Sequence, residues 1–115
     1  MLLGKDQIKN AQDLQYEEIP TEEWGKGSVV RIRSWTGKDR NAMEQEWLKK
    51  DNNTTGFKEK MIVISVVNDK GELIFDSNDT KWLTGKAAAP IDRIATAVMR
   101  MNGLAGTDVD DALKN

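Results

Sequence analysis

Apolar residues are spaced differently in successive parts of the chain, and each spacing predicts a different element. The densest apolar run covers residues 61–67 and is rich in Val and Ile; the polar stretch 68–71 follows, and apolar residues resume at Leu73. β-Branched residues suit a pleated strand, while Asn, Asp and Gly accept the backbone of a tight turn. Residues 61–75 are therefore predicted to form a β-hairpin, with strands at 61–67 and 72–75, on the floor of the core.

One alternative for this apolar run stays open. The run follows the charged residues Lys58, Glu59 and Lys60. Periodicity alone does not separate a strand that is buried on both faces from a helix that is buried all round. Residues 58–67 are therefore expected to be either a strand or a helix.

A second pair of strands is predicted within residues 15–35. Residues 16–20 form an edge strand in this prediction, because Pro20 has no N–H to donate to a central ladder. Over residues 28–35 the side chains then alternate between two faces. Val30 and Ile32 share one face, and the other face carries Arg31, Arg33 and Trp35.

Two longer segments have the spacing of amphipathic helices. The first, about 37–50, follows Thr36, a good N-cap residue, and has the carboxylate of Asp39 in its first turn. The second, 87–102, has Pro90 in its first turn, where a missing N–H removes no hydrogen bond. Its apolar stripe and the glycine that ends it are Ile91, Ile94, Ala95, Val98, Met101 and Gly103.

Shorter segments complete the predicted order of elements. Residues 5–14 show a weak helical pattern with Asp6 as a candidate cap, and a short helical turn is expected to hold Trp82 and Leu83. Residues 105–115 are acidic and are expected to form a loose tail or a short helix.

The predicted fold is therefore α+β. It consists of a small antiparallel sheet, made of the 61–75 hairpin and the strands in 15–35, packed against the 37–50 and 87–102 helices. At 115 residues the chain has the length of one domain, placed here at 1–104, with 105–115 as its tail.

Composition excludes several kinds of chemistry. The chain has no Cys and no His, which rules out disulfides, Cys nucleophiles, Ser-His-Asp triads and the usual zinc sites. We expect no catalytic residues, no cofactor and no metal. Lys and Arg number 17 against 19 Asp and Glu, and this even balance argues against a nucleic-acid partner, which needs clustered positive charge.

The same sequence argues against a membrane protein. No stretch approaches the ~20 apolar residues that a bilayer span needs. The first residues are too few and too soon charged for a signal peptide. A reducing cytoplasm is the expected location.

Five residues are candidates for binding a partner, because Trp and Arg are enriched where proteins bind one another most strongly. The alternative is a solvated sheet face on which one Trp covers the Arg stems, and the two interpretations stand about even. The candidates are Trp24, Arg31, Arg33, Trp35 and Trp82.

The order of these signals resembles that of the tail assembly chaperones of long, non-contractile-tailed phages and related prophages. After the N-terminal helix come Tyr16-Glu-Glu-Ile-Pro, Trp24-Gly and the strand Ser28-Val-Val-Arg-Ile-Arg-Ser-Trp, which runs into Thr36-Gly-Lys-Asp-Arg. Then follow Ile64-Ser-Val-Val-Asn-Asp-Lys-Gly-Glu-Leu-Ile-Phe, Trp82-Leu, Ile91-Asp-Arg-Ile, Met101-Asn-Gly-Leu and the acidic end. The likeness covers nearly the whole chain and lies in the ordered set rather than in one motif.

The resemblance implies a non-enzymatic protein that coats the long, helical tape measure protein and keeps it soluble. It also implies recruitment of tail tube subunits, head-to-tail self-association into spirals, and departure before the virion is complete. The location implied is the host bacterial cytoplasm. A ribosomal −1 frameshift at the codons for Lys114-Asn115, which would produce a longer form, is a hypothesis of the same origin.

Two other classes of function remain as alternatives. One is a structural subunit that stays in the virion, such as a minor tail or head-completion protein. The other is an enzyme, which without His or Cys would have to work through carboxylates, Lys, Ser or Tyr.

Overall fold

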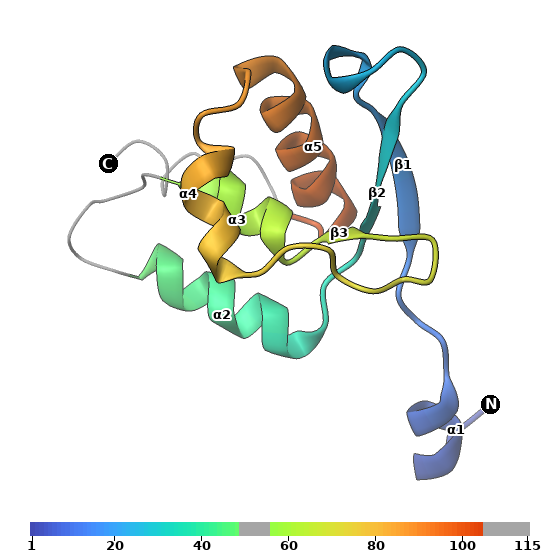
Figure 1. The fold of residues 1–115 in the computed structure, drawn as a ribbon. Helices are drawn as coiled ribbons and strands as arrows, with labels where there is room; N and C mark the ends of the chain where they lie inside the picture. The colour runs from blue at the N-terminus through green and yellow to red at the C-terminus, as the bar shows by residue number, and fades with distance from the viewer. Residues whose placement is uncertain (49–55, 105–115) are drawn as a thin grey trace.

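The fold, seen in a computed structural model that describes residues 1–48 and 56–104, is a small sheet with helices packed to one side of it (Figure 1). The sheet contains β1 (Tyr16–Pro20), β2 (Val29–Arg33) and β3 (Val66–Val67), antiparallel and in that order. Tyr16 pairs with Arg33 and Pro20 with Val29, so β1 and β2 form the hairpin predicted within 15–35. The α+β class is confirmed.

The prediction of a strand over residues 61–67 is wrong for most of its length. Residues Phe57–Val63 form helix α3, which starts after Gly56 in the left-handed region at φ +77°. Both ends of this helix carry buried residues, Phe57 at the start and Met61, Ile62 and Val63 at the end. The three charged residues between them, Lys58 to Lys60, are partly exposed. The helix that was left open as the alternative for 58–67 is therefore correct as far as Val63, and seven residues are too few to show a helical period in the sequence.

The hairpin predicted for 61–75 is present only in a shortened form. Its first strand is reduced to β3, and β3 is linked to the returning chain by a single bridge between Val67 and Leu73. The predicted turn is present: the amide of Asn68 donates to the carbonyl of Glu72 at 2.8 Å, and Gly71 takes the positive φ of +80° that a tight turn requires.

The two predicted long helices are confirmed as α2 (Gly37–Trp47) and α5 (Ala88–Met101). Thr36 and Asp39 cap α2 reciprocally: the Asp39 amide donates to Thr36 Oγ1 at 3.2 Å, and the Thr36 amide donates to Asp39 Oδ2 at 3.1 Å. The last two positions predicted for this helix, 49–50, lie outside the described residues. At the end of α5 the amide of Leu104 donates to the carbonyl of Met99 at 2.9 Å, beyond Gly103 at φ +68°, as a Schellman end requires.

Short helices lie between these elements. They are α1 (Lys5–Asn10), the 3-10 turn η1 (Glu22–Trp24), the 3-10 turn η2 (Ser77–Asp79) and α4 (Thr80–Leu83). The short turn expected around Trp82 and Leu83 is therefore present, whereas α1 starts after Gly4 rather than after Asp6. The tail at 105–115 lies outside the described residues.

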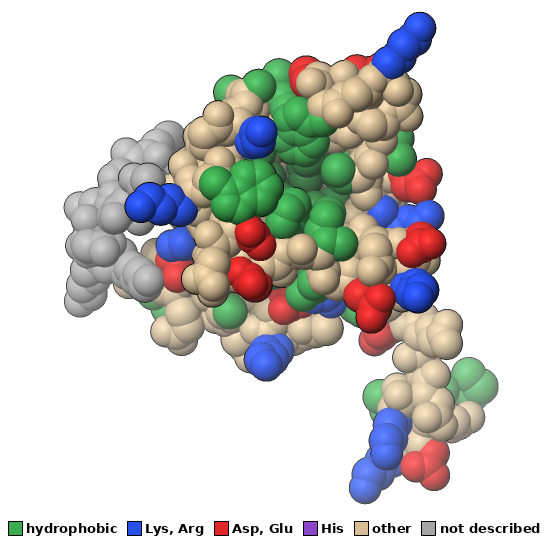
Figure 2. Space-filling view, in the orientation of Figure 1, with side chains coloured by type: hydrophobic (Ala, Val, Ile, Leu, Met, Phe, Trp, Pro, Cys, Tyr) green, Lys and Arg blue, Asp and Glu red, His purple; other side chains and the backbone are tan. Residues whose placement is uncertain are grey.

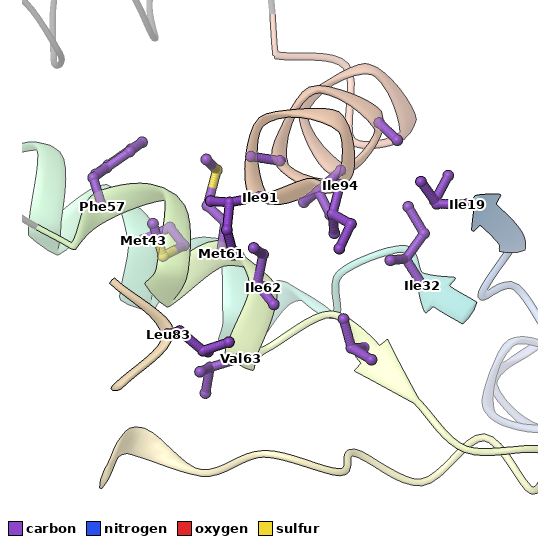
Figure 3. Close-up of a cluster of buried hydrophobic side chains, with 14 of the residues drawn as sticks. Ile19, Ile32, Met43, Phe57, Met61, Ile62, Val63, Leu83, Ile91 and Ile94 are labelled. Carbon is purple, nitrogen blue, oxygen red and sulfur yellow. The ribbon is translucent and has the colours of Figure 1, made fainter. Parts of the chain in front are cut away.

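One core joins the sheet to the helices (Figure 3). Helix α5 lies against β1, β2 and α3, whereas α2 lies beside α3, where the rings of Trp47 and Phe57 are 6.1 Å apart. The largest fully buried apolar side chains come from β2, α3, β3, α4 and α5. They are Ile32, Met61, Ile62, Val66, Leu83, Ile94 and Val98.

Helix α1 takes no part in this core. None of its residues is buried, and Figure 1 shows it standing away from the domain on the chain that leads into β1. We call Met1–Leu14 the N-terminal arm. The predicted 1–104 domain thus consists of a packed body and this arm.

Candidate partner-binding surface

A hollow of about 470 Å³ opens between α4 and the tip of the β1–β2 hairpin. Two of the candidate residues form its walls: Trp24 at the hairpin tip is 39% exposed, and Trp82 on α4 is 47% exposed. Figure 2 shows apolar side chains gathered in the middle of this face of the body. We call the hollow the Trp groove, and it is lined by Trp24, Val30, Phe75, Trp82, Leu83 and Lys86.

The indole of Trp82 is held in place from two sides. Its Nε1 donates to Asp79 Oδ1 at 2.7 Å, and its ring meets the ring of Phe75 edge-on at 5.9 Å. The amide of Asp76 donates to the other carboxylate oxygen of Asp79 at 2.8 Å. Hydrogen bonds from the Asp76 amide and from Trp82 hold the pKa of Asp79 below its ordinary value. The indole is therefore pre-organised although nearly half of it meets solvent.

The opposite wall is fixed by a bridge between the hairpin tip and α5. Arg93 Nη1 and Nη2 donate to the two carboxylate oxygens of Glu23 at 3.0 and 2.8 Å, and Nη1 also donates to the carbonyl of Pro20 at 2.8 Å. The hydrogen bond from Arg93 is the main cause that lowers the pKa of Glu23 to about 2. This bidentate bridge fixes the hairpin tip, and Trp24, the next residue, lines the groove from that tip.

A second hollow, of about 350 Å³, shares Val30 with the Trp groove. It follows β2 where β3 has ended, since β3 pairs only with Arg31 and Ile32. Val29 and Ile74 border it, and each is about half exposed. Apolar surface therefore continues from the groove onto the side of the sheet.

The remaining three candidates lie elsewhere. Arg33 is only 8% exposed; its Nη2 lies 2.9 Å from Asp39 Oδ2 and also donates to the carbonyl of Ile64. Trp35 is half-buried against the core, and its Nε1 donates to Ser65 Oγ at 2.8 Å. Both side chains are engaged within the domain.

Arg31 is the candidate that stays on the surface of the sheet. It shares the strand face of Arg33, as the alternation predicted, and its Nη2 lies 3.0 Å from Glu18 Oε2. Its side chain borders the second hollow rather than the Trp groove. The structure thus places Trp24 and Trp82 in one site. The other three candidates, Arg31, Arg33 and Trp35, lie outside it.

Four residues that line the groove were not among the candidates from the sequence: Val30, Phe75, Leu83 and Lys86. Three of them look like ordinary core positions in the sequence, and Lys86 looks like a solvated charge. Only the packing of α4 beside the hairpin brings them together. The signal that the sequence did offer was the residue type of Trp24 and Trp82, since Trp is enriched where proteins bind one another.

Two features are absent from the part of the chain that the structure describes, a cluster of acidic side chains and a long apolar helix. Within residues 1–48 and 56–104 no three acidic side chains gather as a metal site would require. In the same residues no helix has the length and apolar character to cross a bilayer. The two carboxylates with shifted pKa values, Glu23 and Asp79, are both lowered, which is opposite to what a general acid at neutral pH needs.

No protein-family model, no curated protein and no solved structure matches the chain.

Proposed function

We propose that this protein is a tail assembly chaperone, which binds apolar helical segments of the phage tape measure protein while a tail is being built. The observation that carries the proposal is the Trp groove with its two part-exposed indoles. Asp79 holds the indole of Trp82, and Trp24 extends from a hairpin tip that the Glu23–Arg93 bridge fixes. The sequence order that resembles this family supports the choice of client.

The chemistry of the groove suits such a client. A groove with apolar walls accepts the apolar face of an amphipathic helix, and Trp side chains contribute strongly at such contacts. Its volume of about 470 Å³ accommodates a few side chains rather than a whole helix. Many copies, each binding one short stretch, are therefore needed to cover a long client, and coverage of this kind keeps exposed apolar helices from aggregating.

The wider role follows from the same resemblance. The protein recruits tail tube subunits to the coated client, associates with further copies of itself, acts in the host cytoplasm without catalysis, and leaves before the virion is complete. Neither nucleic acid nor a membrane is a partner in this proposal.

Co-expression with the tape measure protein tests the proposal. Wild-type protein should keep the client in the soluble fraction and co-purify with it. Trp82→Ala should weaken co-purification about tenfold or more, as loss of an aromatic anchor does. The matched control is Trp35→Phe, which keeps an aromatic ring at a Trp position outside the groove; it should bind the client like the wild type. A client that stays insoluble with the wild type, or equal binding by all three proteins, would refute the proposal.

The composition of purified particles separates the chaperone from a structural subunit. Mass spectrometry of finished virions should find the tape measure protein without this protein. If this protein is present there in fixed proportion to the tail proteins, it is a structural subunit.

A further inference from the structure

The N-terminal arm has apolar side chains that nothing in the described chain covers. Leu2 is 98% exposed, Leu3 52% and Ile8 61%, and α1 contains no buried residue. Figure 1 shows the arm extending from the body. Large apolar side chains that project together into water mark a contact with another molecule.

The arm and the Trp groove lie at opposite ends of the β1–β2 hairpin. The arm enters β1 at Tyr16, whereas Trp24 follows the other end of β1, and Val30 is opposite Ile19 near that end. Gln15 fixes the base of the arm, because its amide and carbonyl both bond to Ser34, at 2.8 Å each. The arm therefore points away from the groove of its own body.

We infer that the N-terminal arm of one copy docks in the Trp groove of a second copy. The apolar residues of the arm complement the five apolar residues that line the groove. Helix α1 also carries Lys5, Asp6 and Lys9, of which only Asp6 is opposite in sign to Lys86 at the groove, so the contact rests on apolar surface rather than on charge.

Association through sheet edges is disfavoured by the same structure. Pro20 offers no N–H at the outer edge of β1, and its carbonyl already accepts from Arg93 at 2.8 Å. The outer edge of β3 is bridged to the returning chain at Leu73. The apolar side chains that border the second hollow are Val and Ile, whereas the Trp groove has three aromatic rings in its lining, so the groove is the better match for the arm.

The contact has a predictable strength and geometry. A stable interface uses roughly 20–30 residues on each side, and the described arm, Met1 to Leu14, has 14. One contact is therefore weak and depends on protein concentration. Each copy gives one arm and receives another at the far end, so the association is head-to-tail and open rather than closed.

This contact specifies how the self-association in the proposed function would occur, and its biological role rests on that function. The contact itself can be tested without a client. Arm and client would share the groove, so a client segment that enters the groove releases the arm of the neighbouring copy. Self-association and client binding are then expected to compete.

Mixing two complementary variants tests the contact. The arm variant carries Leu3→Asp with Ile8→Asp, and the groove variant carries Trp82→Ala. All these side chains are about half exposed or more, and circular dichroism checks that both proteins are folded. In analytical ultracentrifugation the wild type should form a concentration-dependent series of oligomers. Each variant alone should be a monomer, and their mixture should form 1:1 dimers, because one intact arm and one intact groove remain.

A charge-matched control separates the apolar contact from the added charge. Asn10→Asp with Gln12→Asp adds two carboxylates to exposed polar positions of the same arm and should associate like the wild type. A monomeric wild type, an arm variant that still forms the oligomer series, or a mixture that contains only monomers would each overturn the inference.

Measuring client binding distinguishes failure of the arm contact from failure of the proposed function. The arm variant should bind the tape measure protein at least as tightly as the wild type, because its groove is intact and unoccupied. If the client does not bind but the mixture forms dimers, the proposed function fails and the arm contact stands. If the client binds and the mixture stays monomeric, the arm contact fails and the proposed function stands.

Discussion

Two arginines on one face of β2 are expected to differ sharply in their contribution to stability. The side chains of Arg33 and Asp39 are 10% and 16% exposed, with 2.9 Å between Nη2 and Oδ2, whereas those of Arg31 and Glu18 are 37% and 55% exposed at 3.0 Å. The same substitution, Arg to Met, removes one cation from each pair. The geometry of the two pairs is alike, so burial is the variable that the comparison tests.

The loss of unfolding free energy expected for each substitution depends on how deeply its ion pair is buried. Removing one partner of a buried ion pair costs about 3–5 kcal/mol, since the other charge is left without compensation. Asp39 still accepts the amide of Thr36 at 3.1 Å, which offsets part of the loss. We therefore expect Arg33→Met to lower the free energy of unfolding by about 2–3 kcal/mol. Arg31→Met should change it by about 0–1 kcal/mol, as exposed pairs do.

Urea unfolding of the two variants and the wild type measures the difference, with unchanged slopes as the check that the unfolded states are comparable. A double variant, Arg33→Met with Asp39→Asn, should recover part of the stability lost by Arg33→Met, because the unpaired charge is gone while a side-chain oxygen remains for the Thr36 amide. Equal effects at positions 31 and 33 would refute the reasoning and return Arg33 to the set of exposed, partner-binding candidates.

Three further predictions concern the groove and the turn beside the sheet. Asp79→Ala should weaken client binding without unfolding the protein, because Trp82 loses the acceptor that orients it; pull-down with the client measures this. Glu23 has a pKa of about 2 in the folded protein, below its ordinary 4.5, so the stability it contributes is full above about pH 4.5 and is lost as pH falls toward 2. Urea unfolding should show a smaller loss of stability over that range in Glu23→Gln, and an identical pH profile would contradict the bridge to Arg93. Gly71→Ala should lower stability by about 1–2 kcal/mol, since its φ is +80°; no change would mean that the turn is relaxed.

Local signals were sufficient for the elements whose two faces differ. The β1–β2 hairpin, α2 and α5 each have one apolar face or a cap that is visible in the sequence: Thr36 with Asp39 begins α2, and Gly103 ends α5. These patterns reflect interactions within a few residues, so they do not depend on the rest of the fold.

The strand predicted for 61–67 was wrong where the chain forms helix α3. Helix α3 contacts α4 and α5 and pairs its Phe57 ring with Trp47 of α2, so its apolar residues fall on more than one side and the helical period is hidden. Val and Ile then favoured a strand by propensity, and tertiary packing overrode that preference. The one available signal was Phe57 four residues before Met61, a single turn of helix.

The candidate site was predictable in its residue types but not in its geometry. Trp24 and Trp82 were candidates because Trp is enriched where proteins bind one another, and they are 58 positions apart in the sequence. Their placement across one groove depends on where α4, which packs on α3, lies relative to the hairpin, and no local pattern specifies this. Arg33 was misjudged as surface because strand alternation places it beside Arg31, while Asp39, at the start of α2, covers it.

The most direct test of the account is to identify what occupies the Trp groove inside cells that are assembling tails. A photo-crosslinking residue in place of Lys86, which lines the groove, reports its neighbours while leaving both indoles intact. The control places the same residue at Lys70, in the turn beyond β3 and outside the groove lining. The account predicts that position 86 captures the tape measure protein during assembly and that position 70 does not. Capture of the tape measure protein at neither position, or equally at both, would contradict the proposal that the protein holds a client in this groove.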